Sequence, residues 1–192
     1  MIRQGRPNLR RVLFETWGAT DDEVHGAVVG DDLVPAARLV ATRAVTIAAA
    51  PSAVFPWLRQ MGFGRAGWYS YDWIDNLGRR SASTILSQWQ DVSTGDVIPG
   101  GGPVGFEVAL AEEPRAFVLS LARTGGITDR IAFTLAYELR DLDGSTRLVS
   151  RVRARVDLPG GRLMERALLG PGDGIMVRRQ LLNLAGRAAQ NA

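Results

Sequence analysis

The feature that most constrains the fold is a change of hydrophobic period along the chain. Across residues 104–156, apolar side chains recur at every second position, which is typical of antiparallel strands with one buried face. Beyond Asp173 the period becomes helical up to about Ala189. One curved sheet must bury a face, and this final helix is the only predicted element long enough to cover it. The apolar stripe of the helix consists of Val177, Leu181, Leu184, Ala185 and Ala188, with Leu182 beside it.

The order of the other elements completes the predicted architecture. A β-branched, alternating stretch over 42–48 predicts the first strand. Pro51 and Ser52 then open a short helix, with Ser52 as its N-cap, and a second short helix is expected over 71–77. The chain is therefore predicted to be α+β, with a curved antiparallel sheet of six to seven strands wrapped around the C-terminal helix. The later strands are expected at 104–110, 117–121, 131–139 and 147–156.

The chain is expected to form one main domain with an N-terminal extension. Residues 1–40 are assigned to the extension, and residues 41–192 to the main domain. Thr20 and Glu23 have the spacing of a capping box, so a short helix is expected from there to about Val29. At the other end, a short helical piece over 163–169 precedes the long helix, which Asp173 is expected to cap.

Composition excludes several kinds of chemistry. The sequence has no cysteine and no lysine, and its one histidine is His25. Thiolate nucleophiles, side-chain Schiff bases and multi-histidine metal sites are therefore not expected, and neither a metal nor a cofactor is predicted. The formal net charge of +3 does not indicate nucleic-acid binding. Arginines at positions 147, 151, 153 and 155 alternate along one strand, which places them on the solvated face of the sheet.

No segment of the sequence indicates a membrane span or a signal peptide. The most apolar run, 45–61, is broken by Pro51 and Pro56 and contains Arg59. The N-terminal residues contain arginines but no apolar core of the kind that signal peptides need. A cytoplasmic protein is expected, either monomeric or homodimeric.

An aromatic cluster is the main candidate for a binding site. Large aromatic or soft side chains are concentrated within residues 57–73, where they fill the core or line the wall and mouth of a cavity. Arg178 lies near the edge of the apolar stripe of the last helix, where it either reaches solvent or meets a ligand anion. The predicted ligand-binding residues are Trp57, Met61, Trp68, Tyr71, Trp73, Phe106, Met164 and Arg178.

Acid–base chemistry would depend on the residues that follow this cluster. At helical spacing Asp72 and Asp75 lie on one face, so the two carboxylates could share a site and one could have a raised pKa. The alternatives are a solvated helix face, or Asp72 as a helix cap or the partner of an arginine. Tyr71 could donate a hydrogen bond to a developing oxyanion. Tyr71 and Asp72 are the candidate catalytic residues.

The sequence resembles the SRPBCC superfamily, the START-like and birch-pollen-allergen-like group that includes polyketide cyclase-like proteins. Residues 45–58 are similar to its opening strand and first helix, and 67–76 (GWYSYDWIDN) are similar to a motif of one uncharacterised branch. Residues 173–187 resemble the last helix of that branch but have Ala185 and Gly186 where the branch often has basic residues. The resemblance implies a helix-grip fold with an apolar cavity.

Three functions remain open from the sequence. The first is a carrier or binding domain for a small hydrophobic or aromatic molecule. The second is a cofactor-independent cyclase or dehydratase acting on a polyketide-like or other apolar substrate. The third is a non-catalytic interaction protein with a filled core. A cavity would argue against the third, and a buried ionisable group with a perturbed pKa facing that cavity would favour the second.

Overall fold

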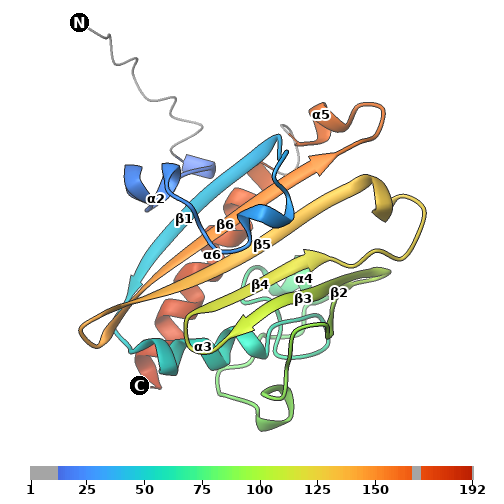
Figure 1. Cartoon of the computed structure of the whole chain (residues 1–192). Coiled ribbons are helices and arrows are strands. Elements are labelled where there is room, and N and C mark those ends of the chain that lie inside the picture. Colours follow the sequence, from blue (N-terminus) through green and yellow to red (C-terminus); the bar gives the residue numbers. More distant parts are fainter. Residues whose placement is uncertain (1–12, 166–169, 192) are drawn as a thin grey trace, which may run out of the picture.

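The computed structural model describes residues 13–165 and 170–191. Its sheet is antiparallel throughout, in the strand order β1-β6-β5-β4-β3-β2. Helix α6, Gly170–Gln190, lies against one face of this sheet (Figure 1). The predicted α+β helix-grip architecture is confirmed. The strands are β1 Leu39–Ile47, β2 Val97–Gly101, β3 Val104–Glu112, β4 Ala116–Leu121, β5 Ile131–Leu142 and β6 Ser145–Val156.

Two short helices follow β1, as the sequence predicted. Helix α3 spans Pro51–Arg59 and helix α4 spans Asp72–Asp75. The predicted N-cap of α3 is wrong: Ala50 occupies that position, and Pro51 is within the first turn, where its missing N–H costs least. Further helical elements in the described part of the chain include α2 Asp21–His25, α5 Gly161–Met164 and the 3₁₀ turns η1 Asp31–Leu33, η2 Ser87–Trp89 and η3 Thr128–Arg130.

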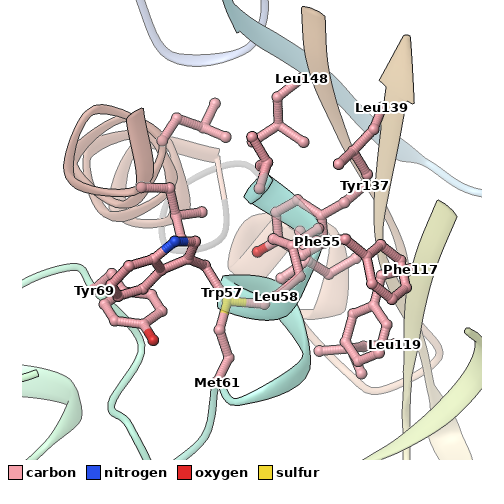
Figure 2. Close-up of a cluster of buried hydrophobic side chains, with 14 of the residues drawn as sticks. Phe55, Trp57, Leu58, Met61, Tyr69, Phe117, Leu119, Tyr137, Leu139 and Leu148 are labelled. Atoms are coloured by element: carbon pink, nitrogen blue, oxygen red, sulfur yellow. The ribbon is translucent and has the colours of Figure 1, made fainter. Parts of the chain in front are cut away.

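The main core lies between α3, α6 and the inner face of the sheet (Figure 2). Phe55 of α3 packs edge-on against Phe117 of β4, with ring centroids 6.1 Å apart. Trp57 packs in the same way against Tyr69, at 6.0 Å. All four of these side chains are fully buried or nearly so. Through these two ring pairs, helix α3 connects the sheet with the loop that leads to α4.

Helix α6 buries the predicted stripe. Val177, Leu181, Leu184 and Ala188 are buried, whereas Leu182 is 43% exposed. The predicted cap is wrong, because α6 begins at Gly170 and Asp173 lies inside its first turn. The short helical piece expected over 163–169 falls partly on α5, and residues 166–169 lie outside the described part of the chain.

The outer face of the sheet is not solvated in the way that the arginine pattern indicated. The segment that contains α2 and η1 crosses this face (Figure 1). Arg147 donates to Glu23, with Nη2 2.7 Å from Oε2, and Arg151 donates to Asp31, also at 2.7 Å. Arg151 is buried, whereas Arg155 is 42% exposed. The prediction failed because strand alternation identifies a face but not what covers it.

The end of one predicted element and one whole strand differ from the prediction. The Thr20–Glu23 capping box is present, but α2 ends at His25 rather than near Val29. The edge strand β2 was not assigned, because its sequence, VIPGG, lacks alternation and contains proline. Among the described residues, no helix combines the length and the apolar character needed to cross a bilayer.

Candidate functional site

A cavity of about 200 Å³, partly open to solvent, lies between α6 and the inner face of the sheet. Strands β2, β3 and β5 form one wall, α6 forms the opposite wall, and residues of the 68–75 segment close one side. Such a space is expected in this fold, because a curved sheet cannot contact one straight helix along its whole surface. The lining residues are Trp68, Ser70, Asp75, Gly100, Phe106, Phe133, Leu135, Asp173, Met176, Val177 and Gln180.

Three aromatic rings form most of the apolar wall. Alternation along β5 turns Phe133 and Leu135 to the same face, and Phe106 comes from β3. The centroids of Trp68 and Phe106 are 5.5 Å apart in an edge-on arrangement, and those of Phe106 and Phe133 are 5.9 Å apart. Contacts of this geometry are favourable for aromatic pairs. The rings therefore support one another and keep the wall in place.

Gln180 organises the buried polar groups at the base of the cavity. Its Oε1 accepts a hydrogen bond from the hydroxyl of Tyr137 at 2.5 Å, and its Nε2 donates to the carbonyl of Trp68 at 2.8 Å. Gln180 lies on α6, Tyr137 on β5 and Trp68 on the loop after α3. Complete burial raises the pKa of the Tyr137 hydroxyl well above its ordinary value. Tyr137 is therefore a neutral donor at physiological pH.

Ser70 and Asp75, in contrast to Gln180 and Tyr137, have buried polar atoms without hydrogen-bond partners among the described residues. The Ser70 hydroxyl and both carboxylate oxygens of Asp75 are buried, and none has a hydrogen-bond partner in the described part of the protein. Burial, with a further contribution from the nearby charge of Asp72, raises the pKa of Asp75 to about 6. Asp75 can therefore exchange a proton close to neutral pH.

A second carboxyl group, Asp173, reaches the cavity from the first turn of α6. Its Oδ2 lies 2.8 Å from Nη1 of Arg43, a fully buried side chain on β1. Arg43 also donates from Nε to the carbonyl of Phe14 at 2.7 Å. Burial raises the pKa of Asp173, and the Arg43 guanidinium opposes that shift. Asp173 thus has a cation beside it, which Asp75 lacks among the described ion pairs.

The predicted ligand-binding residues are divided between the cavity, the core and the surface. Trp68 and Phe106 line the cavity. Trp57 and Met61 are fully buried in the core beside it (Figure 2), and the sulfur of Met61 is 3.6 Å from Nε2 of Gln180. Trp73 is 73% exposed and does not line the cavity. The side chain of Met164 lies outside the described part of the structure.

Tyr71 and Arg178 lie on the other side of α6, in a separate pocket of about 420 Å³. Arg179 lies over the Tyr71 ring, 5.9 Å from its centroid, and Arg178 lies over the Trp17 ring at 4.9 Å. Asp72 accepts a hydrogen bond of 2.5 Å from Ser81. Neither Tyr71 nor Asp72 lines the cavity, and the catalytic role of both stays a prediction.

Several cavity residues were not selected from the sequence. Phe133 follows the same alternation as Leu135, so a prediction of the inward face of β5 could have included it. Gln180 is a polar residue within the apolar stripe of α6, which is a recognisable signal for a buried hydrogen-bonding group. Ser70 carried no local signal. Asp173 was assigned to helix capping, and its pairing with Arg43 links two elements that are far apart in the chain.

Comparison with known proteins identifies relatives in fold only. No family model matches the sequence, and no curated protein matches it. A protein from Rhodobacter sphaeroides is 13% identical with a TM-score of 0.51, over 80% of this chain and 93% of that chain. Norcoclaurine synthase from Thalictrum flavum is 13% identical with a TM-score of 0.45, over 80% and 95%. The Polyketide_cyc-like protein Cgl2372 from Corynebacterium glutamicum is 15% identical with a TM-score of 0.38, over 76% and 88%.

At these identities the likeness concerns the backbone arrangement and not the contents of the cavity. The Rhodobacter match extends over most of both chains. It agrees with the topology described above, in which six antiparallel strands close over α6. The comparisons therefore support the fold, an antiparallel sheet closed over a long C-terminal helix, and nothing beyond it.

Proposed function

We propose that this protein binds a small, mainly apolar aromatic molecule in the cavity between α6 and the sheet, as a carrier or binding domain. The cavity volume of about 200 Å³ supports this proposal. Apolar cavities of about 150 Å³ in other proteins hold benzene. The space next to Phe106, Phe133 and Val177 therefore suits one aromatic ring with a short substituent. A filled core, which an interaction protein of this fold would have, does not fit this observation.

The observation that carries the proposal is the combination of apolar walls with unpartnered polar atoms. Binding sites for small molecules have mainly apolar linings with a few polar groups that fix orientation. A buried polar group without a partner costs about 1–3 kcal/mol. The Ser70 hydroxyl and the Asp75 carboxylate are such groups on the cavity wall. A ligand that bonds to them would recover part of this cost.

Binding of n-propylbenzene tests the proposal. We expect saturable binding, seen as shifts of the Trp68 indole resonance in nitrogen-15 NMR spectra. Val177→Phe places a larger side chain in the cavity and should weaken binding at least about tenfold, which corresponds to about 1.4 kcal/mol. Leu182→Phe makes a comparable change on the exposed side of the same helix and should leave binding unchanged. Equal binding by both variants would place the site elsewhere, and no binding by the wild type would contradict the proposal.

A cofactor-independent enzyme is the second candidate, and Asp75 is the residue that favours it. A group with a pKa of about 6 beside an apolar cavity is suited to general acid–base work near neutral pH. In a proton transfer from carbon, the Asp75 carboxylate would accept the proton, and the Ser70 hydroxyl would donate a hydrogen bond to the resulting enolate oxygen. This arrangement needs no cofactor.

Deuterium exchange into phenylacetone in heavy water tests this second candidate. We expect the protein to accelerate exchange at the benzylic carbon. General bases typically contribute about a hundredfold or more, so Asp75→Asn should lose most of the acceleration. Tyr71→Phe tests the catalytic role predicted for Tyr71 from the sequence: Tyr71 lies outside the cavity, and an unchanged exchange rate would remove it from the mechanism. If the wild type exchanges deuterium only at the buffer rate, the enzymatic candidate is contradicted. The binding function is not affected by that result.

A further inference from the structure

We propose that the ligand of this cavity carries a positively charged amine next to its aromatic part, an inference that rests on the binding function proposed above. The cavity wall includes two carboxyl groups, Asp75 and Asp173, and no basic side chain among its described lining residues. Arg43 neutralises Asp173. Asp75 has no cationic partner among the described ion pairs and remains uncompensated.

The unpartnered groups on the wall are acceptors, apart from the Ser70 hydroxyl, which can also donate. Among the described lining residues, the buried polar atoms with neither a hydrogen-bond nor an ion-pair partner are oxygens of Ser70 and Asp75, because Oδ2 of Asp173 pairs with Arg43. The amide nitrogen of Gln180 is already engaged by the Trp68 carbonyl. An ammonium group has three N–H donors and no acceptor, so it complements such a set of oxygens. A ligand carboxylate would instead face the Asp75 carboxylate, and two like charges repel each other.

The aromatic wall adds to the same preference. Trp68, Phe106 and Phe133 form a continuous set of rings, with centroids 5.5 and 5.9 Å apart along the series. The faces of such rings attract cations, most strongly where water is excluded. The serine at position 70 is nine-tenths buried and supplies one more oxygen on the wall. An aromatic wall with a carboxyl group at one place fits an arylalkylamine, which has an aromatic part and a cationic part.

Three probes of similar size test whether the cavity prefers a cationic, a neutral or an anionic ligand. 2-Phenylethylamine is a cation at neutral pH, n-propylbenzene is its neutral isostere, and phenylacetate is an anion. At pH 7.5 we expect the amine to bind about tenfold to a hundredfold more tightly than n-propylbenzene, the range expected for hydrogen bonds to a charged group. Phenylacetate should bind most weakly. Isothermal titration calorimetry gives the three dissociation constants.

Variants identify the group responsible for the preference. Asp75→Asn keeps the shape of the side chain and removes its charge. It should reduce the ratio of the affinity for 2-phenylethylamine to the affinity for n-propylbenzene to about one. Ser70→Ala should reduce the ratio by a smaller factor. The control is Asp91→Asn, at an exposed aspartate that lines none of the described pockets, and it should retain the full ratio. Circular dichroism spectra and melting curves establish that each variant is folded, and the Ser70→Ala ratio still tests the site if Asp75→Asn does not fold.

The outcomes distinguish this inference from the proposed function. If n-propylbenzene and the amine bind equally, the binding function stands and the inference is overturned. Tighter binding of phenylacetate would also overturn it. An amine preference that survives both Asp75→Asn and Ser70→Ala would show that these residues do not recognise the amine, and would overturn it as well. If none of the three probes binds, the proposed function fails together with the inference.

Discussion

Arg43→Met is expected to lower the free energy of unfolding by about 3–5 kcal/mol, the usual cost of removing one partner of a buried ion pair. Arg43 is fully buried and connects three parts of the chain: β1, the first turn of α6 through Asp173, and the carbonyl of Phe14. Without the guanidinium, Asp173 must either remain charged in a buried position or take up a proton. Urea-induced unfolding at pH 7 measures the loss.

A double variant separates the charge from the packing. Asp173→Asn removes the carboxylate that Arg43→Met leaves uncompensated, so the double variant should be more stable than Arg43→Met alone. Arg115→Met is the control, because Arg115 is 76% exposed and pairs with Glu112 only at the surface. Pairs of that kind contribute about 0–1 kcal/mol. A loss for Arg43→Met no greater than for Arg115→Met would contradict the structural role of the buried pair.

Arg151→Met is expected to release the N-terminal segment from the outer face of the sheet and to cost about 2–4 kcal/mol. The Arg151 guanidinium donates to the carbonyl oxygens of Glu23 and Gly26, at 2.6 and 2.9 Å, and to the Asp31 carboxylate at 2.7 Å. Hydrogen bonds that involve a charged group contribute about 1.5–3 kcal/mol each in favourable cases, and their effects are not additive. Methionine can fill the space but offers no donor.

Hydrogen exchange distinguishes release of this segment from general destabilisation. In Arg151→Met the amides of residues 20–34 should exchange faster than in the wild type, while those of β5 remain protected. Arg155→Met changes the same strand and the same face at a half-exposed position, and should leave the segment protected. Uniformly faster exchange across the sheet would show that Arg151 supports the whole domain and not this segment in particular.

The architecture could be predicted because its signals are local in the sequence. Alternation in β5 and β6 and the helical stripe of α6 each follow from the periodicity of a single element. The edge strand β2 could not be found in this way, because Pro99 and two glycines remove the pattern. The burial of Arg151 under the N-terminal segment could not be predicted either, because its partners in that segment lie more than a hundred residues away along the chain.

The candidate site could be predicted only in part, because only some of its residues have a local signal in the sequence. Trp68 and Phe106 belong to apolar segments, and both line the cavity. Helical spacing placed Asp72 and Asp75 on one face and allowed for a raised pKa, which occurs at Asp75. Which of the two carboxylates turns to the cavity depends on how the 68–76 loop packs against α6, through bonds such as that from Asn183 to the carbonyl of Tyr69 at 2.7 Å. No local pattern contains that information.

A crystal structure of the protein soaked with bromobenzene tests the central claim most directly, because the bromine atom is located by its anomalous scattering. The account predicts a bromine peak between the sheet and α6, in contact with Phe106, Phe133 or Val177. The same soak of Val177→Phe should give no peak there. A wild-type crystal with side chains filling this space and no bromine in it would contradict the claim that a ligand binds between the sheet and α6.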